Sequence, residues 1–292
     1  MLSIIISSYQ AHYFSALEKN IAETIGIPYE IIKIENPGIM GICEAYNKGA
    51  EKSKFEHLLF LHEDVRFDNL NWGNILMDKY FQLQNVGILG LAGDKVKFHL
   101  PYGFSSGLIK LGYMFVKHKE GDAKHFLIPQ NPLKVKPMDG VFLAMKKDVW
   151  NRLKFDESIK GYHFYDLDIT LRSSEHYQNY LVHDIDFLHF STGNFGTEWV
   201  NACIKFNKRI YSSYDYVAPK QKRDIRKFWY KKLSGEKINF GTRLQYMISM
   251  GANKDTLQDA LAFLLPAYQL SEYKEKFRRS IYPYWTSKEE KM

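Results

Sequence analysis

The sequence has little of what stabilises secreted or membrane-spanning proteins. Its 292 residues contain two cysteines, Cys43 and Cys203, without a CxxC spacing, which argues against disulfides and a cysteine zinc site and favours a reducing compartment. No apolar run approaches the ~18 residues that cross a bilayer. The start, Met1 to Ile6, has no basic leader and no cleavage signal and is typical of a first strand. We therefore expect a cytoplasmic protein whose membrane contact, if any, is peripheral.

Several motifs of common enzyme classes are also missing. The chain has no HExxH, no P-loop, no GxGxxG and no GxSxG elbow. These absences argue against the usual hydrolases, nucleotide triphosphatases and dinucleotide-binding enzymes. The chemistry must therefore be sought in acids and histidines whose spacing is less distinctive.

Aromatic residues and local positive charge are abundant. Aromatics make up 15% of the chain, which suits sugar stacking, interfaces or a membrane surface without separating them. Of the net charge of +7, Pro219 to Lys237 carries +6, from eight basic and two acidic residues. This distribution predicts one local basic patch on residues 220–237, a possible contact with anionic membrane, and argues against nucleic acid as a partner.

Hydrophobic periodicity predicts an α/β fold for the first two thirds of the chain. Apolar strand patterns alternate with helical patterns, and this order favours a mostly parallel, Rossmann-like sheet flanked by helices. The expected strands are 3–8, 29–34, 58–61, 86–91, 141–145, 180–182 and 186–189. The expected helices are 12–25, 42–52, 74–84, 147–153, one starting at 165, and 199–214. Residues 94–136 are interpreted as an excursion over the active face.

The remaining residues predict a second region. Beyond residue 215 the patterns are helical, with segments 242–250 and 254–277 after a basic-aromatic stretch. We therefore divide the chain into a catalytic α/β domain, 1–215, and a helical basic-aromatic C-terminal region, 216–292.

The sequence pattern centres on Leu58 to Asp64, where a continuous apolar run meets a histidine and two acids. Such a run is typical of a strand buried on both faces, and ligands bind beyond the carboxyl ends of such strands. Mg²⁺ and Mn²⁺ prefer oxygen ligands and are often shared between carboxylates and substrate phosphates. The hypothesis is that Asp64 holds a divalent metal against a phosphorylated ligand; the alternative is that it only begins a turn.

Two further groups have both a structural and a chemical interpretation. Asp166 and Asp168 stand at an expected helix start, where they could cap the helix, or where one could act as a general base. His183 and His189 end expected strands before the turn 191–194, and each could be a metal ligand or a hydrogen-bonded core residue. The residues alone leave these alternatives open.

Five segments, in this order, resemble the family 2 glycosyltransferases of the GT-A fold. They are Ser3 to Tyr9; Gly41 to Ala50 with Leu58 to Asp64, similar to "G-x-x-x-A-R-N-x-G … L-F-L-D-x-D"; Met138 to Lys147; Phe155 to Glu157 with Tyr165 to Arg172, similar to "F-D-E … E-D-x-D-L-x-L-R"; and His189 to Ser191. The resemblance covers about residues 1–212.

The resemblance implies an inverting hexosyl- or hexosaminyltransferase that uses a nucleotide-sugar, with UDP-sugar favoured, and Mn²⁺ or Mg²⁺. A glycan or lipid-linked acceptor and a role in cell-surface polysaccharide synthesis would follow. By the same resemblance the catalytic base is Asp166, with Asp168 supporting the helix start, and the metal ligands are Asp64 and His189. The implied donor contacts are Tyr9, Glu35, Asn47, Glu63, Asp139 and Gly140, with Tyr9 and Glu35 at the base and ribose and Glu63 on the ribose side.

The sequence departs from this pattern at three positions. His62 replaces the first acid of D-x-D, Tyr46 the usual Arg, and Tyr165 the Glu before the base. His62 lowers the negative charge available to a metal. Two alternatives therefore stand beside the enzyme: a catalytically silent GT-A domain that binds nucleotide or glycan, and a membrane- or RNA-binding adaptor that uses the basic segment.

Overall fold

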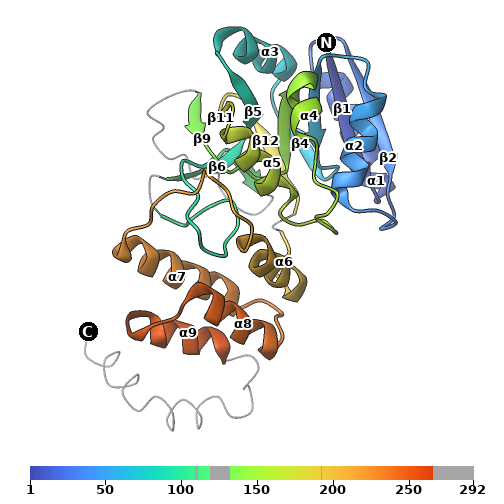
Figure 1. The fold of residues 1–292 in the computed structure, drawn as a ribbon. Helices are drawn as coiled ribbons and strands as arrows, with labels where there is room; N and C mark the ends of the chain where they lie inside the picture. Colours follow the sequence, from blue (N-terminus) through green and yellow to red (C-terminus); the bar gives the residue numbers. More distant parts are fainter. Residues whose placement is uncertain (109–110, 119–131, 192, 266–292) are drawn as a thin grey trace, which may run out of the picture. The chain divides into compact units, whose positions relative to one another are not determined.

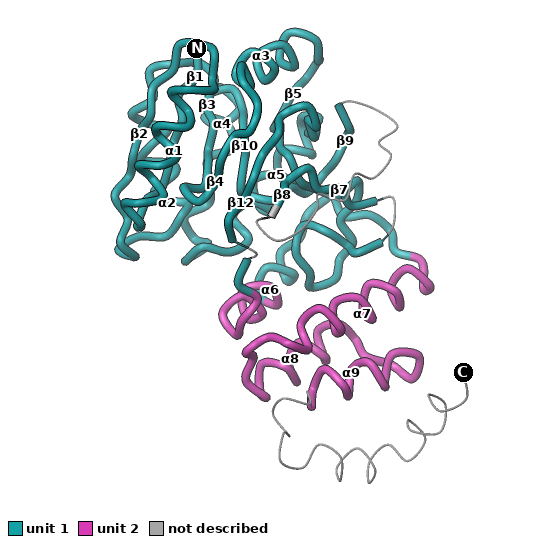
Figure 2. The backbone as a smooth tube through the Cα atoms, turned by 180° about the vertical axis from the view of Figure 1, so that it is seen from behind, with its two compact units in different colours: residues 1–194, 205–217 teal, residues 195–204, 218–292 magenta. Residues whose placement is uncertain are grey.

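The computed structural model describes residues 1–108, 111–118, 132–191 and 193–265 (Figure 1). By the density of its internal contacts the chain divides into one unit of residues 1–194 and 205–217 and another of residues 195–204 and 218–292 (Figure 2). The boundary expected after residue 215 remains a prediction about independently folding domains. No helix among the described residues is long and apolar enough to cross a membrane.

A mixed, mostly parallel sheet forms the centre of the first unit, as the sequence predicts. Among the described residues its strand order is β2-β1-β3-β10-β5-β11-β9. The strands are β1 (Leu2–Ser8), β2 (Tyr29–Glu35), β3 (His57–Leu61), β5 (Val86–Gly90), β9 (Leu133–Val135), β10 (Phe142–Lys146) and β11 (Gln178–Leu181). Strands β1, β2 and β3 are parallel, whereas β10 runs antiparallel between β3 and β5.

Helices cover both faces of this sheet (Figure 1). Apolar residues of α1 (Ala11–Thr24) and α3 (Trp72–Gln82) pack with alternate strand residues such as Ile4 and Leu59. The intervening strand residues, such as Ile5 and Phe60, pack against α2 (Ile42–Lys52), α4 (Lys147–Leu153) and α5 (Tyr165–Ser174). Because β1 and β3 are buried on both faces, they carry the continuous apolar runs seen in the sequence.

Two small sheets lie within the excursions of the first unit. Strand β12 (Phe187–His189) pairs antiparallel with β4 (Val65–Phe67) and parallel with β8 (Val116–His118). Strands β6 (Ala92–Asp94) and β7 (Gly112–Met114) form an antiparallel pair. The segment 94–136, interpreted from the sequence as an excursion over the active face, contributes β7 and β8 to the small sheets and β9 to the central sheet, while residues 109–110 and 119–131 lie outside the described ranges.

The second unit is helical in its described part. It contains α7 (Pro219–Ser234), α8 (Phe240–Met250), the 3-10 turn η1 (Lys254–Thr256) and α9 (Leu257–Leu264), while α6 (Thr197–Asn207) runs across the sequence boundary between the units. Its core is aromatic: Tyr230 stacks on Phe263 with ring centroids 5.4 Å apart. The fully buried Arg243 donates to the carbonyl oxygens of Ile238 and Phe263.

Two predicted helices end earlier than expected. The helix predicted for 199–214 stops at Asn207, because Arg209 and Tyr211 instead turn toward acids of the first unit. The helix predicted for 254–277 is η1 followed by α9, which ends at Leu264; residues 266–277 lie outside the described part.

Candidate functional site

The carboxyl ends of β1, β2 and β3 meet at one edge of the sheet. Ser8 pairs with Glu35 and Ile6 with Leu61, so that Tyr9, Glu35 and the residues after Leu61 emerge side by side. Tyr9 is 67% exposed, and Glu35 is exposed and paired with Lys33. The structure thus brings the predicted donor residues of three strands to the same edge.

Glu63 is buried at this edge and supports the start of α1. Its Oε1 accepts hydrogen bonds from the backbone amides of Tyr9, at 3.1 Å, and Gln10, at 3.0 Å. A carboxylate at a helix start is favourable because of the exposed amides and the helix dipole there. The other oxygen, Oε2, is buried and has no hydrogen-bond partner among the described residues. It is thus an unsatisfied buried acceptor, which a ligand hydroxyl could satisfy.

Asp64 and His189 meet because two short strands pair. In the β4·β12 ladder His189 lies opposite Val65, and the amide of Phe190 donates to the carbonyl of Asp64. The imidazole Nε2 of His189 lies 3.3 Å from Asp64 Oδ1 and 3.0 Å from the hydroxyl of Ser191. This pairing joins residues far apart in the sequence.

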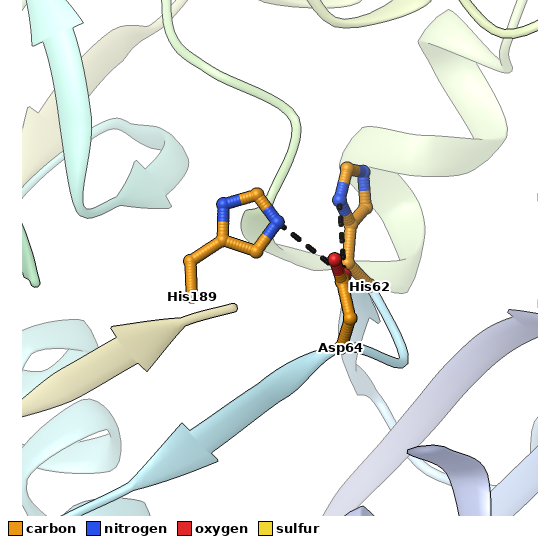
Figure 3. Close-up of side chains that lie close together, drawn as sticks. All are labelled: His62, Asp64 and His189. Carbon is orange, nitrogen blue, oxygen red and sulfur yellow. Dashed lines mark ion pairs between the residues drawn. The ribbon is translucent and has the colours of Figure 1, made fainter. Parts of the chain in front are cut away.

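His62 completes a cluster of three side chains around Asp64 (Figure 3). Its Nδ1 lies 4.0 Å from Asp64 Oδ1, and one ligand atom from each residue lies within 4.8 Å of the others. Two atoms bound to one metal ion are separated by about 3 to 4 Å. His62, Asp64 and His189 therefore form a group that fits a divalent metal, whereas His183 packs on Phe115.

The cluster keeps its carboxylate ionised. Burial opposes the ionisation of Asp64, but the hydrogen bond from His189, the nearby His62 and Ser191 lower the pKa of Asp64 to about 2. Burial and the neighbouring His189 lower the pKa of His62. An ionised carboxylate and neutral imidazoles are the forms that bind metals.

Asp166 lies in the first turn of α5, and its pKa is shifted in the opposite direction from that of Asp64. Its carboxylate accepts hydrogen bonds from the amides of Gly140, at 3.0 Å, and Leu167, at 2.9 Å. Burial, and then the nearby negative charge of Asp139, nevertheless raise the pKa of Asp166 to about 7. A carboxyl group with such a pKa can take up a proton near neutral pH. Asp139 also accepts from the amide of Val141, 2.9 Å away.

The backbone around Asp166 is tightly shaped. A Cβ on Gly140 would overlap the hydroxyl of Tyr165 and come within 3.0 Å of Asp166 Cβ, so only glycine fits there. Phe164, just before α5, has a φ of 66°, an unfavourable value for a residue with a bulky side chain. Such strain is often found at functional sites, where the surroundings hold it in place.

Tyr165 links the metal-ligand cluster to α5. Its hydroxyl lies 2.8 Å from Nε2 of His62 and donates to the carbonyl oxygen of Gly140, 3.2 Å away. The first turn of α5 therefore adjoins the cluster His62–Asp64–His189. His62 and Tyr165 are separate departures from the family pattern in the sequence. The occurrence of both in one chain is the sequence signal for this pair.

The side chain of Asn47 holds the loop after α4 in place. Its amide makes four hydrogen bonds, donating to the Phe155 carbonyl and Glu157 and accepting from Trp150 and the Phe155 amide. In this arrangement no donor or acceptor of Asn47 remains for a ligand. The predicted contact of Asn47 with the donor would require some of these hydrogen bonds to break.

Both carboxylate oxygens of Asp168 also form hydrogen bonds within the protein. Its Oδ2 accepts from Arg172, and its Oδ1 accepts from Arg209, at 2.7 Å, and Tyr211, at 2.6 Å. Arg209 also donates to Asp156. The roles of Arg209 and Tyr211 were not predicted from the sequence, because both residues fall within the continuous helix expected for 199–214.

The chemical content of this edge is an acceptor for ligand hydroxyls, a group that fits a divalent cation and a carboxylate poised to accept a proton. Glu63 provides the first, the cluster around Asp64 the second and Asp166 the third. This combination suits the displacement of a phosphate leaving group by a hydroxyl nucleophile.

Comparisons with known proteins bear on the family and the fold of the chain. A model of a glycosyltransferase-like family matches residues 3–222. No curated protein matches the sequence. Among solved structures, S. aureus TarS superposes with a TM-score of 0.51 at 11% identity, covering 94% of this chain and 52% of that one. A structure of GalNAc-T7 with UDP, GalNAc and Mn²⁺ gives a TM-score of 0.47 at 11% identity, covering 97% and 58%. The chain thus spans about half the length of these proteins, and at 11% identity the likeness to TarS concerns the fold alone.

Proposed function

The chain belongs to the glycosyltransferase-like family, and from this premise we propose that it transfers a sugar from a nucleoside-diphosphate sugar to a hydroxyl acceptor, with inversion at the anomeric carbon. UDP-sugars are the favoured donors, and the transferred group is a hexosyl or hexosaminyl residue. The observation that carries the proposal is Asp166, whose pKa is raised to about 7 beside a group of residues that fits a divalent metal.

In this proposal the three strand ends hold the donor. Tyr9 and Glu35 contact the base and ribose, and Glu63 Oε2 accepts a ribose hydroxyl, since it is buried without a partner among the described residues. Asp139 and Gly140 approach the donor sugar. The buried position of Glu63 favours this assignment, because an unpaired buried acceptor costs free energy that a ligand hydroxyl would recover.

Asp64 and His189 would hold Mn²⁺ or Mg²⁺ against the diphosphate. When bound, such a cation neutralises the negative charge that develops on the departing nucleoside diphosphate. The low pKa of Asp64, about 2, keeps this ligand ionised at every pH at which the enzyme would work. The Nε2 atom of His189, which faces Asp64, also lies 3.0 Å from the hydroxyl of Ser191 and would exchange this contact for the metal.

Asp166 supplies the base. Its carboxylate takes the proton of the acceptor hydroxyl while the hydroxyl oxygen forms a bond to the anomeric carbon. The bond from that carbon to the diphosphate oxygen breaks, and the nucleoside diphosphate leaves. With one carboxylate at the sugar and a direct displacement, the configuration inverts. Gly140 holds Asp166 in place through its amide, 3.0 Å from Oδ2.

The proposed acceptor is a glycan or a lipid-linked saccharide, as in polysaccharide synthesis at a cell surface. A lipid-linked acceptor would suit attachment to anionic membrane through 220–237. Residues Lys220, Arg223, Lys227 and Lys231 recur at helical spacing on α7, and Lys227 and Lys231 are exposed. Of the neighbouring aromatics, Trp229 and Tyr230 belong to the core of the second unit, and Phe228 is 40% exposed. The attachment would therefore depend mainly on charge.

Nucleotide release is the experiment that tests this function. Wild type and Asp166→Asn are incubated with UDP-, GDP- and dTDP-sugars and Mn²⁺, while the melting temperature reports donor binding. We expect Asp166→Asn to bind the donor as wild type does and to lose about a hundredfold or more in turnover. A catalytically silent domain would show donor binding with no release in either protein, and an adaptor would show neither.

A further inference from the structure

The proposed function leaves His62 without a role, although it points into the metal-ligand cluster. Its Nδ1 faces Asp64 Oδ1 at 4.0 Å, and its ring centroid lies 5.6 Å from that of His189 (Figure 3). The Nε2 atom, on the far side of the ring, contacts Tyr165. The two nitrogens of His62 thus have separate surroundings, one in the cluster and one at α5.

The contacts of Tyr165 favour a proton on the Nε2 atom of His62. A tyrosine hydroxyl has one hydrogen, and a carbonyl oxygen can only accept. With the Tyr165 hydrogen directed at the Gly140 carbonyl, 3.2 Å away, the Tyr165 oxygen accepts from Nε2–H of His62 at 2.8 Å. The neutral ring therefore has its lone pair on Nδ1, the atom that faces Asp64.

Two imidazole nitrogens and one carboxylate oxygen then surround one point, from His62, His189 and Asp64. Imidazole suits transition metals, and affinities for such sites rise from Mn²⁺ through Co²⁺, whereas Mg²⁺ prefers oxygen ligands and releases water reluctantly. A second imidazole in place of an acid therefore changes which cation the site favours.

We propose that His62 is a third metal ligand through Nδ1, that Tyr165 is the positioning residue that holds it there, and that the site selects transition-metal dications over Mg²⁺. This inference rests on the metal site of the proposed function and assigns its selectivity. The substitutions at His62 and Tyr165 then act as a pair, because the Tyr165 hydroxyl orients the imidazole that replaces an acid.

Calorimetric titration of the full chain with Mn²⁺, Co²⁺ and Mg²⁺, each alone and with UDP, tests the proposal. Wild type should bind Co²⁺ most tightly and Mg²⁺ most weakly. His62→Asp should lower the ratio of Mg²⁺ to Mn²⁺ dissociation constants by about tenfold, because an oxygen ligand replaces nitrogen. It should also change the visible absorption of the bound Co²⁺, which reports its ligands independently of activity.

The positioning role of Tyr165 has its own matched variants. Tyr165→Phe should weaken Mn²⁺ binding by about tenfold, the usual effect of removing a group that orients a metal-bound histidine. Tyr80→Phe is the control, since Tyr80 is a buried tyrosine of α3 whose hydroxyl has no hydrogen-bond partner among the described residues. It should leave Mn²⁺ affinity unchanged.

The outcomes separate this inference from the proposed function. If Asp64→Ala abolishes metal binding but His62→Asp leaves both the selectivity and the Co²⁺ spectrum unchanged, His62 is not a ligand and the inference is wrong. The same holds for Tyr165 if its Phe variant binds Mn²⁺ as wild type does. If wild type binds no cation with or without UDP, the metal-assisted function itself fails.

Discussion

Asp166 is subject to influences that act on its pKa in opposite directions. The amides of Gly140 and Leu167 stabilise its charged form, whereas burial and the charge of Asp139 favour the protonated form and prevail. The position of Asp166 at a helix start could be predicted from the sequence. Its pKa could not, because Asp139 comes from a different element and burial depends on the packing of both.

The raised pKa predicts how the rate depends on pH. A general base must be unprotonated, so kcat/KM with saturating Mn²⁺ should be constant above pH 7 and fall about tenfold per unit below it. Asp139→Asn removes the neighbouring negative charge and should move the midpoint of this profile to lower pH. Steady-state rates of nucleotide release between about pH 5 and pH 9 would give the midpoint of the profile for wild type and for Asp139→Asn.

The control for this shift is Glu23→Gln, which removes one exposed charge at the end of α1. Its profile should coincide with that of wild type. A wild-type midpoint near the ordinary pKa of a carboxyl group, or an unchanged midpoint in Asp139→Asn, would contradict the account of Asp166.

At the scale of elements, the strand and helix patterns near the site were predicted well and the directions of some strands were not. Helix α2 spans Ile42–Lys52, as expected from its period. Strand β10 is antiparallel to both neighbours, which its apolar residues cannot reveal, because a strand buried on both faces has the same composition in either direction. The β4·β12 pairing, which joins Asp64 to His189, was also invisible, since each strand has only three residues.

Helix α2 and the loop after α4 are joined by Asn47. Asn47→Leu keeps a similar volume but leaves the Phe155 backbone groups and the Trp150 Nε1 buried without their partner. Unsatisfied buried groups cost about 1 to 3 kcal/mol each, so we expect the free energy of unfolding to fall by about 3 kcal/mol or more. Urea denaturation would measure this change.

The matched control is Asn74→Leu, on the exposed side of α3, where the side chain makes one hydrogen bond to Gly26. Its effect should stay within about 0.5 kcal/mol. If Asn47→Leu instead leaves stability unchanged and weakens donor binding, Asn47 contacts the donor, as the family resemblance implied.

At the scale of the whole molecule, the sequence predicted an α/β region followed by helices, and charge patterning singled out 220–237. Two aromatic residues of that segment, Trp229 and Tyr230, are buried in the core of the second unit. A helix that is both basic and amphipathic carries signals for packing and for surface contact, and only the three-dimensional structure separates them.

Attachment to anionic membrane makes a prediction about α7. The double variant Lys227→Glu/Lys231→Glu reverses two exposed charges on one face of the helix. Cosedimentation with phosphatidylserine-containing vesicles should fall by about tenfold or more, since each basic residue near such a surface contributes about 1 kcal/mol. Lys19→Glu/Lys52→Glu changes the charge equally on exposed residues of α1 and α2 and should have little effect. If both double variants lose vesicle binding equally, the binding depends on total charge and α7 is not the attachment site.

The central claim is that Asp166 acts as the base in glycosyl transfer, and the turnover of Asp166→Asn relative to its donor affinity tests it most directly. With the donor that stabilises wild type, the account predicts the same dissociation constant for the variant and a rate of nucleotide release lower by about a hundredfold or more. A variant that binds the donor and releases nucleotide at the wild-type rate would contradict the account.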